Sequence, residues 1–265
     1  MYVGASTANF YPMLTEESLE LLIRLGFQDI EVFVNTESEI ENGYLDELRR
    51  RADDAQVRIR SLHPYISAVE PYLLFSAYQR RFEDGCGIYH RLFAAAERLG
   101  AKIVVMHGDR VEGVLPQEES IGRYERLYDI GQEYGVTLAQ ENVLRYRSSG
   151  LEYLAAMRRQ LGNKAHFVFD LKQSLRCGHR PEQVLDVMGD AVCHVHISDH
   201  KDEELCLVPG QGVTDYERLF SQLKALQYQG GLMLELYRNN FSTEKELTDG
   251  KHFLQHLLNL NKQKA

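Results

Sequence analysis

The sequence contains few cysteines, and they suggest neither a disulfide framework nor a thiolate metal site. The four cysteines are Cys86, Cys177, Cys193 and Cys206, and no two of them form a C-x-x-C pair. A domain of 265 residues buries enough apolar surface to fold without disulfide bonds or a structural metal ion. We therefore expect four reduced thiols in a cytoplasmic protein.

Long apolar runs and an excess of positive charge are also missing. No apolar run approaches 18 residues and no signal peptide is recognisable, so we expect neither a membrane span nor a leader. The 39 acidic residues outnumber the 30 basic ones and give a net charge of −9. Because binding to a phosphate backbone usually needs a basic face, a nucleic-acid partner is not expected.

What the sequence does contain is a repeated alternation of short apolar runs with longer amphipathic stretches. Several of the short runs are β-branched and almost continuously apolar, which is typical of strands buried on both faces of a parallel sheet. The predicted strands are residues 2–5, 29–34, 58–62, 102–106, 137–140, 166–169, 192–197 and 231–236. The predicted helices are residues 16–26, 79–100, 118–134, 151–161, 181–188, 215–227 and 244–260.

Strand and helix therefore alternate through eight units, and no low-complexity linker divides them. Consecutive units of this kind form parallel sheets with right-handed crossovers, and eight of them commonly close into a barrel. The sequence predicts an α/β fold, a single eight-stranded parallel β/α (TIM) barrel domain over residues 1–265. An open doubly wound sheet is the alternative, but no G-x-G-x-x-G motif follows the first strand.

Imidazole or carboxylate side chains stand at the ends of six successive predicted strands. They are His63, His107, Glu141, Asp170, His196 and Glu235. In β/α barrels these strand ends meet at one mouth, where the active site is built. A helix cap, an ion pair or a structural histidine would explain any one of them alone. Six on one face predict a functional site.

Three of these side chains are carboxylates beside strongly apolar runs, and buried acids are costly unless they are paired or bound to a metal. A divalent cation would relieve their mutual repulsion, and carboxylates with an imidazole suit Mn, Mg, Co or Zn. His194 shares a strand face with His196, so spacing alone cannot choose between them. The following Ser198-Asp199 places His196 nearer the mouth. Glu31 can point into the barrel, but the sequence assigns it no role.

Seven short motifs, in this order, resemble the xylose isomerase-like TIM barrel superfamily, and within it the sugar phosphate isomerase/epimerase members. Each motif alone is weak, but together they extend over nearly the whole chain. The motifs are Ser61-Leu62-His63-Pro64, Val105-Met106-His107-Gly108, Ala139-Gln140-Glu141-Asn142, Phe169-Asp170-Leu171-Lys172-Gln173, His194-Val195-His196-Ile197-Ser198-Asp199, Pro209-Gly210-Gln211-Gly212 and Leu234-Glu235.

The resemblance implies one divalent metal ion with a defined ligand set and a substrate pocket beside it. The implied ligands are Glu141, Asp170, His196 and Glu235, and the implied pocket residues are His63 and His107. A histidine that often contacts substrate three positions after the strand-six aspartate is Gln173 in this sequence. An amide can hydrogen-bond a hydroxyl group but cannot act as a base, so Gln173 keeps only a substrate-binding role.

These expectations predict a divalent-metal-dependent sugar or sugar phosphate isomerase or epimerase that acts on a small-molecule carbohydrate through a metal-bound enediolate. Glu141 and Glu235 are the predicted catalytic pair, one removing a proton and the other returning one. Arg145 and Arg147 follow the fifth strand, where they could clamp a substrate phosphate or carboxylate or lie in a solvated loop. Members of the resembling family are often dimers or tetramers, so the resemblance is compatible with a homo-oligomer.

Three other functions fit parts of the pattern. A dehydratase or isomerase of inosose-type ketones shares the enolising step, and a barrel that binds sugar without catalysis would share the pocket. A metal-dependent AP endonuclease-like phosphodiesterase resembling endonuclease IV would use three zinc ions. Its Asp-x-His pair would fall near Glu204-Leu205-Cys206-Leu207-Val208, where the histidine is missing. With Gln173 in place of a further ligand, a three-zinc cluster is not expected.

Overall fold

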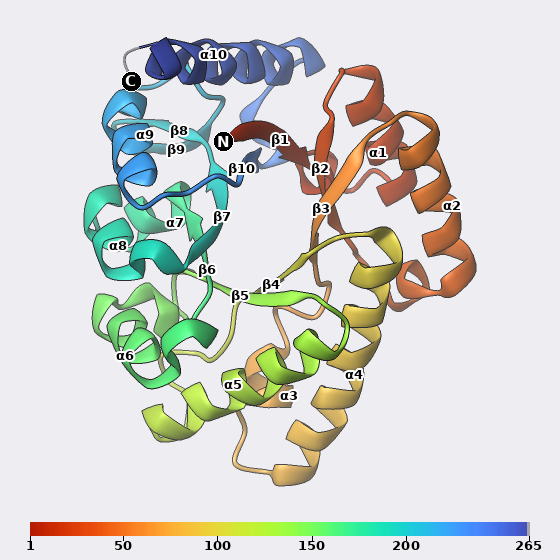
Figure 1. Ribbon diagram of the computed structural model, residues 1–265, viewed down its shortest axis with the longest axis vertical. Helices are drawn as coiled ribbons and strands as arrows, with labels where there is room; N and C mark the ends of the chain where they lie inside the picture. The colour runs from red at the N-terminus through yellow and green to blue at the C-terminus, as the bar shows by residue number, and fades with distance from the viewer. Residues whose placement is uncertain (264–265) are drawn as a thin grey trace.

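Eight parallel strands close into a barrel in the computed structural model, which describes residues 1–263 (Figure 1). The order around the barrel is β1-β10-β7-β6-β5-β4-β3-β2, as predicted for a TIM barrel. The barrel strands are β1 (Tyr2–Ser6), β2 (Asp29–Phe33), β3 (Arg58–His63), β4 (Ile103–Met106), β5 (Thr137–Glu141), β6 (Phe167–Asp170), β7 (Val192–Ile197) and β10 (Gly231–Leu234).

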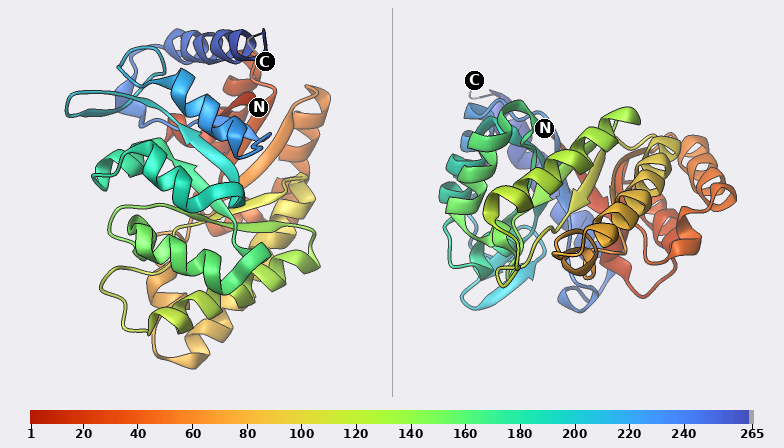
Figure 2. Two further views of the ribbon diagram at one scale, coloured as in Figure 1. Left: turned by 60° about the vertical axis from the view of Figure 1, so that its left-hand side comes forward. Right: turned by 90° about the horizontal axis from the view of Figure 1, so that it is seen from below.

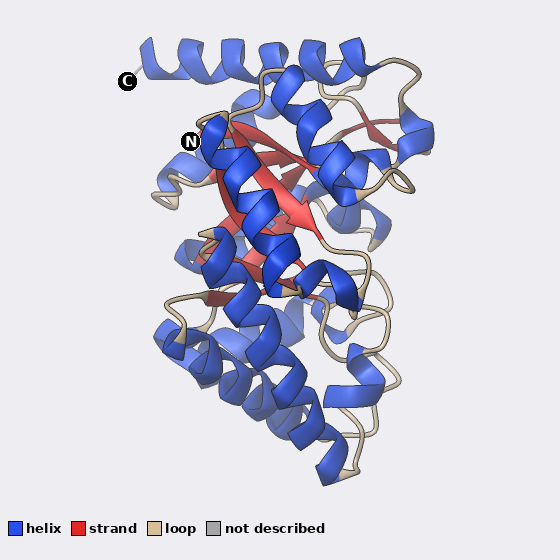
Figure 3. Cartoon of the chain, turned by 90° about the vertical axis from the view of Figure 1, so that its right-hand side faces the viewer, coloured by secondary structure: helices blue, strands red, loops and turns tan. Residues whose placement is uncertain are grey.

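The helices form a layer outside the strands (Figure 3). They are α1 (Thr15–Arg24), α2 (Asn42–Asp54), α3 (Glu70–Leu74), α4 (Gln79–Leu99), α5 (Gln117–Glu133), α6 (Leu151–Leu161), α7 (Leu171–Arg176), α8 (Pro181–Met188), α9 (Tyr216–Ala225) and α10 (Glu244–Gln263). Short 3-10 turns lie at Thr7–Phe10, Glu37–Ile40, Arg147–Ser149, Gly162–Lys164, Gly189–Ala191 and Arg238–Asn240.

The predicted helices are all present, and three further helices, α3, α7 and the longer α2, were not indicated by the sequence pattern. The apolar contacts of α2 come from Leu45, Leu48 and Ala52, and charged residues occupy most of its other positions. Three small or medium apolar residues at helical spacing are enough to pack α2 on the barrel, although they leave a weak periodic signal.

Small apolar side chains fill part of the barrel interior below the polar mouth. Val105, Ala139 and Val168 form a separate buried cluster and are not exposed. Successive strand side chains alternate between the two faces, so the residue two positions later points the same way but nearer the mouth. Those later residues are His107, Glu141 and Asp170. The pleat therefore carries the six strand-end residues to one end of the barrel.

A short antiparallel hairpin, β8 (Asp199–Lys201) and β9 (Glu204–Leu207), follows β7 and extends from the barrel (Figure 2). The carboxylate of Asp199 accepts hydrogen bonds from the backbone N–H groups of Gly210, Gly212 and Thr214. Asp199 thus fixes the loop after the hairpin. Among the described residues, no helix is both long enough and apolar enough to cross a bilayer.

Candidate active site

The six polar residues predicted at the strand ends do meet at the mouth of the barrel. His63, Glu141 and Asp170 are the last residues of β3, β5 and β6, and His196 lies in β7 directly across from Asp170 in the β6–β7 register. His107 and Glu235 follow β4 and β10 by one residue. All are buried except His107 and Glu235, which are partly exposed.

Four of them form a group that we call the mouth cluster: Glu141, Asp170, His196 and Glu235. One side-chain oxygen or nitrogen from each lies within 4.8 Å of those of the others. The Nδ1 atom of His196 is 3.2 Å from Oε1 of Glu141, 3.4 Å from Oε2 of Glu235 and 3.7 Å from Oδ2 of Asp170. Three carboxylates and one imidazole nitrogen therefore converge on a common point.

Asp170 is held rigidly, and one of its oxygens is left without a hydrogen bond. Its Oδ1 atom caps α7 by accepting from the backbone N–H of Gln173 at 2.7 Å, and Asn142 bonds both its backbone N–H and its C=O. Its buried Oδ2 atom accepts no hydrogen bond, although Nζ of Lys172 lies 3.3 Å from it. Burial raises the pKa of Asp170 despite the nearby Lys172 and His196. A cation would compensate this oxygen, so the donor set fits a hard or borderline divalent metal ion.

The pKa values of Glu141 and Glu235 shift in the opposite direction from that of Asp170. Burial acts to raise the pKa of Glu141, but hydrogen bonds from His107, His196 and His63 hold that pKa well below its usual value. Burial likewise opposes ionisation of Glu235, whereas His196 and Lys172 lower its pKa. Both side chains are therefore carboxylates at neutral pH.

His63 and His107 form a pair beside Glu141. Their Nε2 atoms are 3.2 Å apart, and Nε2 of His107 lies 3.0 Å from Oε2 of Glu141. The ring of His63 stacks on Phe33 with centroids 4.5 Å apart. This trio also has the spacing of a small ligand set, so the mouth offers room for a second cation next to the mouth cluster.

The loop after β4 is shaped to present His107. Oε2 of the buried Glu70 accepts from the backbone N–H groups of His107 and Gly108. Gly108 has a φ of 83°, and a Cβ there would lie 2.5 Å from Oε1 of Gln140. Glycine is required at this position because an L side chain would be strained and would collide with Gln140.

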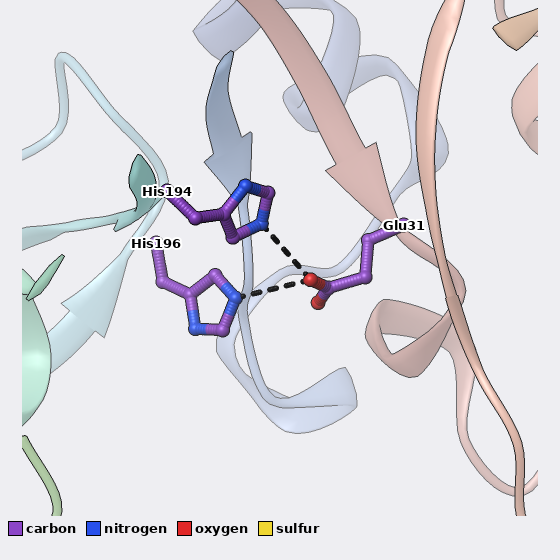
Figure 4. A group of neighbouring side chains, drawn as sticks. All are labelled: Glu31, His194 and His196. Atoms are coloured by element: carbon purple, nitrogen blue, oxygen red, sulfur yellow. Dashed lines mark hydrogen bonds and ion pairs between the residues drawn. The ribbon is translucent and has the colours of Figure 1, made fainter. Parts of the chain in front are cut away.

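A second polar group lies deeper in the barrel, on the other side of His196 (Figure 4). We call Glu31, Ser61 and His194 the interior group. Oε2 of Glu31 is 3.0 Å from Nε2 of His194 and 3.3 Å from Nε2 of His196, and it accepts from Ser61 Oγ at 2.7 Å. Both histidines thus point inward, as strand periodicity predicted, and only His196 reaches the mouth cluster.

Lys172 is a member of the site that the sequence analysis quoted within a motif without giving it a role. Its side chain is 5% exposed, and its Nζ atom lies 2.9 Å from Oε2 of Glu235 and 3.3 Å from Oδ2 of Asp170. Burial opposes the charge, but Asp170 and Glu235 hold the pKa of Lys172 well above its usual value. The signal was present in the sequence as a lysine two residues after a strand-end aspartate.

The remaining candidates lie around these groups. Gln173 lines the mouth, and its Oε1 atom accepts from the backbone N–H of Leu144 at 3.3 Å. Arg147 pairs with Asp109 and donates to the backbone carbonyl groups of Gly113 and Leu115. Its guanidinium group therefore stabilises the loop after β4. Arg145 is exposed and has a φ of 71°.

A cavity of about 360 Å³ opens above the mouth cluster, within the range of roughly 300–1,000 Å³ typical of small-ligand pockets. Its lining combines aromatic or apolar surface with the polar groups already described. The lining residues are Ala8, Tyr11, Phe33, Asn35, His63, His107, Glu141, Lys172, Gln173, Glu235, Leu236 and Tyr237.

Known proteins resemble this chain over most of its length. A family model described as xylose isomerase-like TIM barrel matches residues 19–257. An uncharacterized protein of Mycobacterium leprae is 26% identical, with 95% of each chain covered, and one of Mycobacterium tuberculosis is 26% identical over 92% of this chain and 91% of its own.

Solved structures that resemble this chain include several sugar epimerases. A D-tagatose 3-epimerase-like protein has a TM-score of 0.81 at 20% identity, with both chains fully covered. D-psicose 3-epimerase of Clostridium cellulolyticum, solved with D-tagatose, has a TM-score of 0.79 at 14% identity over 99% of each chain. These likenesses show the shared fold. The family model, which spans most of the sequence, shows that the chain belongs to the xylose isomerase-like TIM barrel family.

Proposed function

We propose that this protein is a divalent-metal-dependent isomerase or epimerase of a small carbohydrate, with Glu141 and Glu235 as its proton-transfer pair. The observation that carries the proposal is the convergence of three carboxylates and His196 Nδ1 in one group, of which Glu141 and Glu235 also line a cavity of sugar-binding size. The names of the structural neighbours, which include 3-epimerases of D-tagatose, D-psicose and L-ribulose, support the same reaction class.

Glu141, Asp170, His196 and Glu235 would hold the cation, which would polarise a substrate carbonyl and acidify the adjacent C–H bond. The protein supplies the proton transfers. One of Glu141 and Glu235 takes the carbon-bound proton, and the other returns a proton to the opposite face in an epimerase or to the neighbouring carbon in an isomerase. Both carboxylates line the cavity and both are ionised at neutral pH, so either can start as the base.

His63 and His107 would hold substrate hydroxyl groups, since their Nε2 atoms face Glu141 from the cavity side. Gln173 also lines the cavity and offers an amide for hydrogen bonding. Phe33 and Tyr237 supply flat apolar walls of the kind on which a sugar ring can pack. These groups would orient the substrate and limit the access of water to the reacting carbon.

We further propose that the substrate is an unphosphorylated ketose. Among the described residues that line the cavity, Lys172 is the only lysine or arginine, and two carboxylates already engage it. Arg147 is committed to Asp109, and Arg145 is not among the lining residues. A phosphate dianion would therefore lack the cationic clamp that phosphate sites usually contain.

The test is solvent deuterium uptake at the α-carbon of D-tagatose and D-fructose in the presence of Mn²⁺, followed by NMR. Glu141→Gln and Glu235→Gln should each slow uptake by roughly 100- to 10,000-fold, the usual contribution of a positioned acid or base. Asp29→Asn is the control, because Asp29 is a buried carboxylate that pairs with Arg58 and Arg60 at the other end of the barrel. Wild-type rates in both glutamine variants would rule out the two-carboxylate scheme.

One observation favours a second candidate, a metal-dependent phosphodiesterase. The His63–His107–Glu141 trio could hold a second cation that shares Glu141 with the mouth cluster, as in hydrolases with two metal ions. A count of bound metal per chain by elemental analysis separates the two. One ion is expected for the isomerase, and two ions with cleavage of an abasic-site duplex would favour the nuclease.

A further inference from the structure

Lys172 differs from an ordinary ion-paired lysine in its position. It is the second residue of α7, two residues after Asp170, and its ammonium group reaches both Asp170 and Glu235 at the edge of the cavity. Its Nζ atom also lies 5.0 Å from the centre of the Tyr237 ring, whose side chain forms part of the rim. A buried lysine is rare unless it is paired, and here both partners belong to the mouth cluster.

The protein offers a matched comparison at its surface. Lys164 also bridges two carboxylates, with Nζ 2.9 Å from Glu125 and 3.0 Å from Asp129. Its side chain is 34% exposed, whereas that of Lys172 is 5% exposed. Lys164 joins two neighbouring helical segments at the surface, while Lys172 faces a cavity.

Lys172 retains a donor that the protein does not use. An ammonium group has three N–H bonds and no acceptor, and Glu235 and Asp170 take at most two of them. Among the described residues no further hydrogen-bond acceptor engages this ammonium group. A third N–H is therefore free for a ligand in the cavity.

The charge balance of the site also indicates that Lys172 acts on a ligand in the cavity. The three carboxylates of the mouth cluster carry three negative charges, and a divalent cation would neutralise two of them. Lys172 supplies the third positive charge, so the loaded site would be neutral. When the base takes a proton from carbon, its negative charge passes to a substrate oxygen. A fixed positive group beside that oxygen stabilises the transition state more than the ground state.

We propose that Lys172 is a catalytic residue that donates a hydrogen bond to the substrate oxygen on which this charge develops; this role rests on the isomerase function proposed above. The step balances without a redox partner. The carbon-bound proton moves to Glu141 or Glu235, the C–H electron pair forms the new C=C bond, and the carbonyl π pair moves to the oxygen that faces Lys172. Reprotonation at carbon reverses these shifts and releases the neutral sugar.

The competing explanation is that Lys172 only occupies the place of the metal ion and balances the acids in its absence. The two explanations predict opposite results when its charge is removed. If Lys172 only competes with the metal, Lys172→Met should bind Mn²⁺ more tightly and react at least as fast. If Lys172 stabilises the oxygen, the same variant should react slowly however tightly it binds Mn²⁺.

The experiment uses the full chain with saturating Mn²⁺ and follows deuterium uptake from solvent into D-tagatose and D-fructose. Isothermal titration gives the Kd for Mn²⁺ separately. Lys172→Met should slow uptake by roughly 100- to 1,000-fold, as expected for loss of a donor to a developing oxyanion, without weakening Mn²⁺ binding. Lys172→Arg keeps the charge and should recover part of the rate. Lys164→Met is the control and should match the wild type.

Wild-type uptake in a Lys172→Met variant that binds Mn²⁺ would overturn the role of Lys172 and leave the isomerase proposal intact. A slow variant whose Mn²⁺ binding is lost to the same extent would also overturn it, because the lysine would then act on the metal site alone. If Lys172→Met does not fold, Lys172→Leu, which also lacks both the charge and the donor, replaces it with the same readings. A wild-type chain that shows no uptake with any ketose would overturn the proposed function, and the role of Lys172 with it.

Discussion

The two ring nitrogens of His196 face two regions of opposite character. On the Nε2 side lies the interior group, in which a single carboxylate, Glu31, is surrounded by Ser61 and two imidazole rings. On the Nδ1 side lie three carboxylates and the ammonium group of Lys172. Both regions use the same few residue types, yet only the second opens to the cavity.

The difference lies in access and in charge balance. Glu31, Ser61 and His194 are almost completely buried, and hydrogen-bond donors surround the one shared oxygen of Glu31. The mouth cluster gathers three carboxylates around His196, with Lys172 as their cationic neighbour, and Oδ2 of Asp170, like Oε1 of Glu31, accepts no hydrogen bond. Because each group keeps one buried oxygen without a hydrogen bond, access and the number of carboxylates distinguish them: the enclosed interior group fixes geometry, whereas the mouth cluster faces the cavity, where a ligand can enter.

The interior group also decides which nitrogen of His196 is available. If Nε2 carries the proton and donates it to Glu31, Nδ1 keeps its lone pair and directs it at the mouth cluster. Metal-binding histidines are commonly oriented in this way by a carboxylate on the opposite nitrogen. We therefore expect Glu31 to position His196 without touching metal or substrate.

The largest effect should come from the mouth side. Asp170→Asn should weaken Mn²⁺ binding by more than the roughly 100-fold that loss of an outer partner costs, since it replaces an anionic ligand by a neutral one. The fold should survive, because asparagine caps a helix as well as aspartate does. Titration calorimetry with Mn²⁺ and the Tm of the metal-free protein measure the two effects. Wild-type affinity in this variant would exclude Asp170 as a ligand.

A smaller effect is expected from the interior side. Glu31→Gln retains an oxygen that can accept from His196 but removes the charge that favours the required tautomer, so Mn²⁺ affinity should fall by roughly 10- to 100-fold. Asp29→Asn, which changes a buried carboxylate on the same strand at its far end, should leave Mn²⁺ binding unchanged. An electron paramagnetic resonance spectrum of bound Mn²⁺ that is identical in Glu31→Gln and wild type, with equal affinity, would contradict the positioning role.

Much of this arrangement could be predicted from the sequence because parallel strands impose simple rules. The apolar runs predicted the eight barrel strands, and the barrel architecture placed His63, Glu141 and Asp170 at one mouth. The period of two along a strand also predicted that His194 and His196 point the same way. The local sequence pattern and the barrel topology were therefore sufficient to predict where these residues lie.

Other features depended on contacts that no local pattern encodes. Glu31 and His194 are 163 positions apart, and their hydrogen bond requires β2 and β7 to face each other across the closed barrel. Lys172 has four rotatable side-chain bonds, so its position in the chain does not show whether its ammonium group reaches solvent or the cavity. The α2 helix was missed because its few apolar residues are separated by charged ones.

The smallest effect should follow from changing the interior group without changing the charge on Glu31. Ser61→Ala removes one donor to Glu31, which keeps His194 and His196 as partners, so unfolding of the metal-free protein should become easier by about 1 kcal/mol. Mn²⁺ affinity should stay close to that of wild type, because the ring of His196 keeps its own bond to Glu31. Urea denaturation and Mn²⁺ titration measure these quantities, with Ser221→Ala, an exposed serine on α9, as the control. If Ser61→Ala weakens Mn²⁺ binding as much as Glu31→Gln does, the whole interior group acts on the metal site, and the division between a side that orients and a side that binds is wrong.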